Sequence, residues 1–250
     1  MLSRRAAFFC AVSALASVRQ AFGLPGAHLS EESLPFMFSS IRRMISVGSR
    51  SEPGALERQR RATYAAFLGE PEYVFRGQDD QDVVIEAYGR DFSPTEAVNE
   101  GYVLLTNGMS DRKMRLANDA AQRDVEARAE LMWYVREPTP EIVANLRWLA
   151  QFPFIDDTYV AFGHRIPMPG APLSDCPFKT FLFLTPIIRT DQQLSDALRV
   201  EKDKVDILTV NLISDAEYAF IKRDGLDGFL DILDERDYPV IFDPARRSYL

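Results

Sequence analysis

The sequence predicts a single domain of the α/β (α+β) class, in which helices cover a mixed β-sheet. Short apolar or β-branched runs alternate along the chain with segments that carry helix-capping signals. We find no internal repeat and no low-complexity stretch that would point to a solenoid or a disordered chain. Hydrophobic residues make up 46% and charged residues 26% of the 250 residues, which is enough apolar material for one folded core. A sheet covered by helices is the arrangement that buries such elements best.

The first expected element of the domain is a helix over residues 54–67. It should begin at Pro53-Gly54 and end before Gly69, and Pro71 blocks its continuation.

Three strands are expected next. Residues 83–88 and 102–106 are short apolar or β-branched runs bounded by glycines. Residues 126–135 place alternate apolar side chains on one face, at the spacing of a strand: Leu131, Trp133 and Val135.

The second half of the chain carries clearer capping signals. Thr139 before a proline is a helix start, because its hydroxyl can accept an early backbone N–H. Ser214 and Glu217 form a capping box, which predicts a helix that ends at Gly225, and residues 226–233 should form one more helix.

Two apolar runs in this half are expected to be strands. Residues 178–184 are almost continuously apolar, as in a buried central strand, and residues 205–213 have a similar pattern.

The most distinctive local sequence is the run from Asn107 to Ser110. Asn-Gly readily adopts positive φ, so this run is expected at a hairpin turn. An exposed loop here would offer Asn107, Met109 and Ser110 to a protein partner, with the methionine as a soft apolar contact.

The charge excludes one class of partner and leaves two explanations open. A net charge of −8 and a pI near 5.0, without a dense basic stripe, exclude nucleic-acid binding. The acidity either keeps the protein soluble or steers a basic partner. An acidic face that includes Asp79, Asp80 and Asp82 would serve the second purpose.

No motif for a cofactor or a metal is present. Two cysteines, Cys10 and Cys176, exclude a disulfide framework and a cysteine-based zinc site. Glycine-rich phosphate loops, His-Glu-x-x-His, Gly-x-Ser-x-Gly and Cys-x-x-Cys do not occur in the sequence. We therefore expect no cofactor, no metal and no catalysis, and we expect Cys176 to be a small core residue.

One catalytic alternative remains, a hydrolase-type enzyme in which His164 pairs with Asp156 or Asp157 as a general base. The competing interpretation is a partly buried histidine that bonds a backbone group. All three residues are also candidates for partner binding, if the enzyme hypothesis fails.

The tail around Arg246 and Arg247 has two interpretations. The arginines either anchor the C-terminal segment by ion pairs or present their charge to a partner.

Residues 1–23 have the features of a twin-arginine-like export signal. Arg4 and Arg5 precede an apolar run too short to span a membrane, and small residues lead to a cleavage position after Gly23. The protein would then be exported or periplasmic, without stable membrane insertion once the leader is removed. The alternatives are a retained anchor, or a cytoplasmic protein that starts at Met37 or Met44. Residues 24–61 are expected to be a tether with a helical extension around residues 38–47.

The ordered set of these fragments resembles the suppressor-of-fused-like domain family over residues 62–250. The matching fragments are YVLLTNGMS (102–110), EL (130–131), LAQFP (149–153), FGH (162–164), PLSDCPF (172–178) and DPARRS (243–248). The resemblance implies a non-catalytic domain that binds another protein. Animal relatives bind transcription factors between this domain and a second one, which the match does not include. Bacterial single-domain relatives look like immunity proteins, so a toxin is the expected partner.

Overall fold

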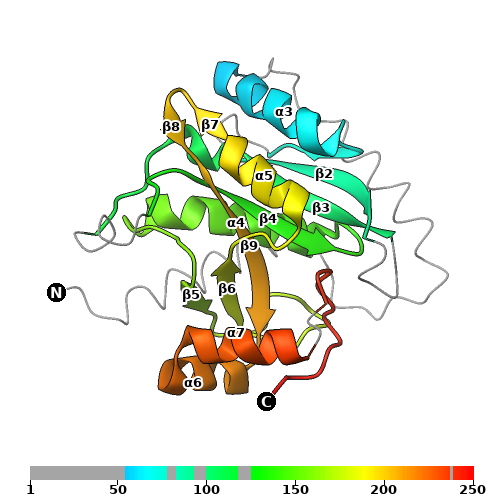
Figure 1. Cartoon of the computed structure of the whole chain (residues 1–250), viewed down its shortest axis with the longest axis vertical. Coiled ribbons are helices and arrows are strands. Elements are labelled where there is room, and N and C mark those ends of the chain that lie inside the picture. The colour runs from blue at the N-terminus through cyan, green and yellow to red at the C-terminus, as the bar shows by residue number, and fades with distance from the viewer. Residues whose placement is uncertain (1–53, 78–82, 93–99, 118–124, 237–238) are drawn as a thin grey trace.

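The computed structural model describes residues 54–77, 83–92, 100–117, 125–236 and 239–250 (Figure 1). Seven strands form one mixed sheet in the order β1-β2-β3-β4-β9-β6-β5. All neighbouring pairs in it are antiparallel except β4 and β9, which are parallel. The strands are β1 (Tyr73–Phe75), β2 (Val84–Asp91), β3 (Glu100–Asn107), β4 (Ala129–Val135), β5 (Arg165–Pro167), β6 (Thr180–Leu184) and β9 (Asp206–Ile213).

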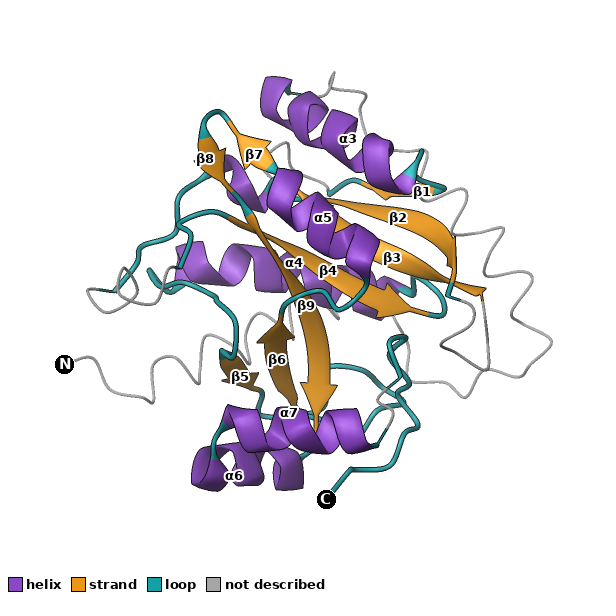
Figure 2. Ribbon diagram, in the orientation of Figure 1, coloured by secondary structure: helices purple, strands orange, loops and turns teal. Residues whose placement is uncertain are grey.

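Helices cover both faces of this sheet (Figure 2). They are α3 (Ala55–Leu68), α4 (Pro140–Ile155), α5 (Arg189–Ala197), α6 (Asp215–Asp224) and α7 (Leu226–Glu235). A short 3-10 helix, η2 (Met109–Asp111), follows β3, and β7 (Arg199–Val200) pairs with β8 (Asp203–Lys204) in a separate hairpin. This arrangement confirms the expected fold class.

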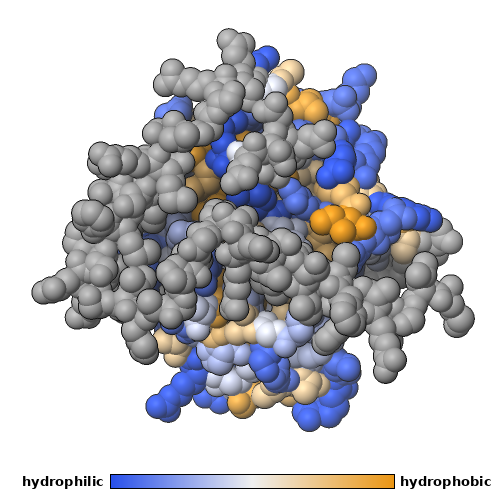
Figure 3. Space-filling view, turned by 180° about the vertical axis from the view of Figure 1, so that it is seen from behind, coloured by the Kyte–Doolittle hydropathy of each residue, from blue (hydrophilic) through white to orange (hydrophobic). Residues whose placement is uncertain are grey.

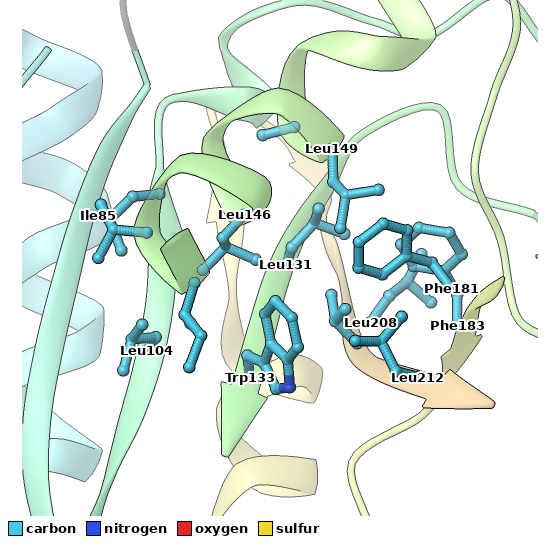
Figure 4. Close-up of a cluster of buried hydrophobic side chains, with 14 of the residues drawn as sticks. Ile85, Leu104, Leu131, Trp133, Leu146, Leu149, Phe181, Phe183, Leu208 and Leu212 are labelled. Carbon is cyan, nitrogen blue, oxygen red and sulfur yellow. The ribbon is translucent and has the colours of Figure 1, made fainter. Parts of the chain in front are cut away.

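One hydrophobic cluster lies between the sheet and α4. Leu146 and Leu149 of the helix point toward Leu104, Leu131 and Trp133 on the strands (Figure 4). Each of these side chains is fully buried, so each removes its whole apolar area from water and stabilises the fold.

The opposite face of the sheet packs against α3 and α5. Tyr64 of α3 and Leu194 of α5 join a second cluster with Met132 and Tyr134 of β4. Strand β4 is therefore buried on both faces, whereas its sequence pattern predicted one apolar face. A third cluster holds α6 and α7 against β6 and β9.

The C-terminal segment lies beside the second half of β4, where β4 and β9 are no longer paired. The two strands pair only over the first half of β4, from Ala129 to Met132. Beyond that point the backbone N–H of Phe242 donates to the carbonyl oxygen of Tyr134 at 2.9 Å, and its ring lies 5.7 Å from that of Trp133. The tail is thus part of the core.

The main expected elements and their caps are confirmed. The Thr139 hydroxyl accepts the N–H of Ile142 at 3.3 Å, and Ser214 and Glu217 cap α6 reciprocally. Helix α3 ends at Gly69, which adopts φ 78°. The elements β1, β5, α5 and the β7–β8 hairpin were not expected.

One expectation is wrong. Asn107-Gly108 does not close a hairpin, because the chain continues into η2 and reaches β4 only at Ala129. The domain boundary expected between residues 61 and 62 stays a prediction, and helix α3 runs across it with Arg60 fully buried. The export leader, the tether up to residue 53, the helical stretch at 38–47 and the acidic run at 79–82 lie outside the described residues.

Two further properties hold for the described part of the chain. None of its helices combines the length and the hydropathy that crossing a membrane requires. Among the same residues, no group of three or more histidine, cysteine or carboxylate side chains is arranged to hold a metal ion.

Candidate functional site

The residues expected in an exposed loop after β3 are buried. Asn107, Met109 and Ser110 expose 2%, 1% and 0% of their surface, so they do not offer a contact to a partner. These residues are buried because the carboxylate of Glu130 on β4 accepts hydrogen bonds from the start of η2 and holds it against the sheet. Glu130 accepts the backbone N–H groups of Gly108 at 3.1 Å and Ser110 at 3.0 Å, and the Ser110 hydroxyl at 2.6 Å.

Arg60 ties α3 to the same cluster. Its Nε donates to Asn107 Oδ1 at 2.7 Å and lies 3.4 Å from Glu130, and its Nη1 pairs with Asp111. Within the described residues, only Nη2 of this buried guanidinium lacks a hydrogen-bond partner. A buried charge of this kind is tolerated only when it is paired, so this contact fixes α3 on the sheet.

A second buried carboxylate, Glu86, extends this polar cluster. It accepts from Arg61 Nε at 2.8 Å, from Asn107 Nδ2 at 3.0 Å and from the Tyr88 hydroxyl at 2.5 Å. Burial and the adjacent charge of Glu86 raise the pKa of Tyr88 far above its usual range. The phenol therefore stays a hydrogen-bond donor, and the cluster has a structural role.

The three residues of the proposed catalytic trio each have contacts elsewhere in the described chain. Asp157 forms an ion pair with Arg115, and Asp156 caps the end of α4. His164 Nδ1 lies 3.3 Å from the carbonyl oxygen of Tyr159, whose ring centroid is 4.7 Å from the imidazole. His164 lines a pocket to which neither aspartate contributes among the described residues. The partly buried histidine next to a backbone carbonyl, the competing interpretation, agrees with this geometry.

Arg246 anchors the C-terminal segment. Its guanidinium donates to Glu217 at 2.7 and 2.8 Å and to the carbonyl of Leu212 at 3.0 Å, and it lies 4.2 Å above the centre of the Phe178 ring. Arg247 is exposed. The anchoring interpretation of the tail is therefore confirmed for Arg246.

The contact with Arg246 also affects the ionisation of the Glu217 carboxyl group. Burial disfavours a charge on Glu217, but the Arg246 guanidinium and the backbone N–H groups of Tyr249 and Ser214 outweigh it and hold the pKa of Glu217 below its usual value.

Cys176 is a buried member of the main cluster, as expected. Burial raises the pKa of its thiol, which lowers its reactivity.

A pocket of about 360 Å³ lies beneath α5, beside the first half of β9. Its lining comes from five segments: the loop before β5, the end of β6, α5, the region from Lys204 to Leu208, and Val125 ahead of β4. Figure 2 shows α5 across the start of β9, with the tip of β6 close by. Sequence reasoning missed this pocket because five distant segments form it and α5 carries no side-chain N-cap.

Phe162 stands exposed at this pocket, with 47% of its surface accessible. Gly163 fixes its loop, since its N–H donates to the carbonyl of Phe183 at 2.7 Å and its φ is 78°. A Cβ at this position would lie 2.8 Å from the Leu226 side chain, and the positive φ strains other residues, so both features favour glycine here. The loop thus holds an aromatic ring in solvent on a rigid support.

Ile187, next to Pro186 of the pocket lining, is 58% exposed. Figure 3 shows the reverse side of the molecule, where hydrophobic residues that are not covered form small groups among hydrophilic ones. Exposed aromatic and aliphatic side chains therefore lie at the rim of a concave, mixed polar lining. The sheet and its covering helices define the class of protein as a small α+β domain.

The chain belongs to the suppressor of fused protein (SUFU) family, whose model matches residues 82–247. Helix α3 and strand β1 lie before the matched region. None of the curated proteins matches the sequence.

Three solved structures share the fold. A suppressor of fused homologue from Neisseria gonorrhoeae has a TM-score of 0.56 at 14% identity, with 78% of this chain and 97% of that chain covered. A chain of the Sufu–Fu complex has a TM-score of 0.59 at 15% identity, with 80% and 93% covered. Suppressor of Fused from Drosophila has a TM-score of 0.55 at 15% identity. The match covers 78% of this chain and 50% of the Drosophila chain.

Proposed function

We propose that this chain is a non-catalytic protein-binding domain whose contact surface surrounds the pocket at Phe162. The observation that carries the proposal is an aromatic side chain, 47% exposed, that a glycine-supported loop holds at the rim of a concave lining. Aromatic side chains are enriched at protein interfaces and commonly supply a large share of the binding energy. Ile187 extends the apolar rim on the side of β6.

Two further points support this function. The Sufu–Fu structure contains a family member bound to another protein. Within the described residues, the pocket that His164 lines includes neither Asp156 nor Asp157, which supports a non-catalytic role over the hydrolase alternative.

Site-specific photocrosslinking tests the proposal. The full chain would carry p-benzoylphenylalanine at position 162 in its native host, and a matched variant would carry it at Asp231, an exposed residue of α7. We expect a single stoichiometric protein adduct from position 162 and none from position 231. Adducts that are identical at both positions, or absent at both, would count against the surface at Phe162.

We further propose that the partner is a toxin and that the protein acts as an exported immunity protein. The basic start and short apolar run of residues 1–23 support export, and the resemblance to bacterial single-domain relatives supports immunity. The gene next to this one should then encode a protein that arrests growth when it is expressed alone. Co-expression of the wild-type chain should restore growth, whereas Phe162→Ser should not. Mass spectrometry of the native N-terminus, with cleavage after Gly23 as the expected result, tests the export.

A further inference from the structure

We infer that the pocket beside Phe162 receives one basic side chain, a lysine or an arginine, from the partner protein. This inference rests on the proposed protein-binding function and names the chemistry that its pocket recognises. The volume of about 360 Å³ is near the lower end of the range for ligand pockets, which suits one long side chain better than a large cofactor.

The charges of the lining favour a cation. Asp196, Asp206 and Lys204 contribute to the lining, and Lys204 Nζ lies 3.5 Å from Asp206 Oδ1. This ion pair offsets the lysine charge, so the pocket keeps one formal negative charge while His164 is neutral. That charge belongs to Asp196, which is exposed on α5 where an incoming side chain can reach it. Opposite charge on the partner adds association rate and specificity.

The apolar part of the lining matches the rest of the same side chain. Lysine and arginine carry long apolar stems behind their charged groups. Ala161, Pro186 and Leu208 supply apolar wall to such a stem. The exposed ring of Phe162 can stack on an arginine guanidinium or face a lysine ammonium in a cation–π contact. An acidic side chain would match neither part, and a purely apolar one would bring no opposite charge to Asp196.

The charge of the whole chain acts in the same direction. A net charge of −8 attracts a basic partner before contact is made. The sequence left two explanations of this acidity open, solubility or steering, and the pocket favours steering.

A peptide selection tests the inference without knowledge of the partner. A randomised peptide library displayed on phage would be selected on the full chain, and the dissociation constants of the selected peptides measured on variants. We expect Lys or Arg at one dominant position. Asp196→Asn should weaken those peptides about two- to fivefold, the effect of losing a largely exposed ion pair. Asp196→Lys should weaken them about tenfold or more, because like charges then face each other.

Asp231→Asn and Asp231→Lys make the same charge changes on α7, which contributes no residue to the pocket lining, and should leave affinity nearly unchanged. The inference is wrong if the selected peptides lack a basic position, or if the variants at 196 and 231 weaken basic peptides equally. Equal loss of peptide affinity in both sets of variants would mean that the overall charge of the chain, and not the pocket, attracts the basic peptides. A crosslink at position 162 without a basic preference overturns the pocket chemistry alone, whereas the absence of the crosslink overturns the proposed function.

Discussion

Two pairs of carboxylates in this domain have opposite roles, although the residue types alone do not distinguish them. Glu130 and Glu86 lie under α3, fully buried, and receive hydrogen bonds from backbone, hydroxyl, amide and guanidinium donors. Asp196 and Asp206 lie at the rim and wall of the pocket, on the other side of α5. The buried pair holds the fold together. In the pocket, Asp206 pairs with Lys204, whereas Asp196 is exposed and accessible to a partner. The proposed function therefore assigns recognition to the exposed pocket carboxylate rather than to the buried pair.

The largest expected effect tests the buried side of this comparison. Glu130→Ala removes one of the two carboxylates that pair with Arg60 and the acceptor of three donors at η2, so the buried guanidinium keeps only Asp111 as its ion-pair partner among the described residues. We expect a loss of about 3–5 kcal/mol in the free energy of unfolding. Urea denaturation monitored by circular dichroism measures it, with Asp196→Ala as the matched control. A loss under about 1 kcal/mol for Glu130→Ala would mean that the cluster relaxes or admits water.

The Glu217–Arg246 contact gives the next effect and a pH dependence. Arg246→Met should cost about 1.5–3 kcal/mol at neutral pH, the usual value of hydrogen bonds to a charged group. The folded-state pKa of Glu217 is lowered. Its contribution to stability is therefore complete above its unfolded pKa of about 4.3 and is lost as the pH falls through the folded value.

The difference between the wild type and Arg246→Met should thus be constant from neutral pH to about pH 5 and shrink at lower pH. Denaturation at a series of pH values measures it. A difference that does not change on acidification would assign the role of Arg246 to its packing on Phe178 rather than to its charge.

A third variant tests the rigid support of the pocket rim. Gly163→Ala places a Cβ against Leu226 and forces an L residue into positive φ, at a cost of about 1–3 kcal/mol. Gly170→Ala is the matched control, because nothing lies within 4 Å of its Cβ position. Thermal unfolding compares them. Equal stability of the two variants would show that the loop adapts, and Phe162 would then lack the fixed orientation on which the binding surface depends.

The sequence predicted the local features of the molecule well and the distant ones poorly. The caps at Thr139 and Ser214 act over three residues, so their hydrogen bonds can be read directly from the chain. The Arg60–Glu130 contact joins residues far apart in sequence, and it overrides the turn tendency of Asn107-Gly108. The apolar run at 178–184 predicted a buried strand correctly because continuous burial leaves a pattern in any single segment.

The pocket left no such pattern. Phe162, Asp196 and Asp206 come together only because the loop before β5, α5 and the start of β9 meet at one place, and no single segment encodes that meeting. The signal that was available is weaker: a glycine, Gly163, directly after an aromatic residue, which indicates a turn next to that ring.

The smallest expected effect tests the accessible side of the comparison. Asp196→Asn should change the free energy of unfolding by less than about 0.5 kcal/mol, because an exposed carboxylate makes little contribution to folding. Glu86→Gln, the same chemical change at a buried site, should destabilise the protein several times more, since Arg61 and Tyr88 lose a charged acceptor. Urea denaturation of the two variants side by side measures the contrast. If Asp196→Asn is as destabilising as Glu86→Gln, the pocket carboxylate has a structural role, and the division between folding and binding carboxylates no longer holds.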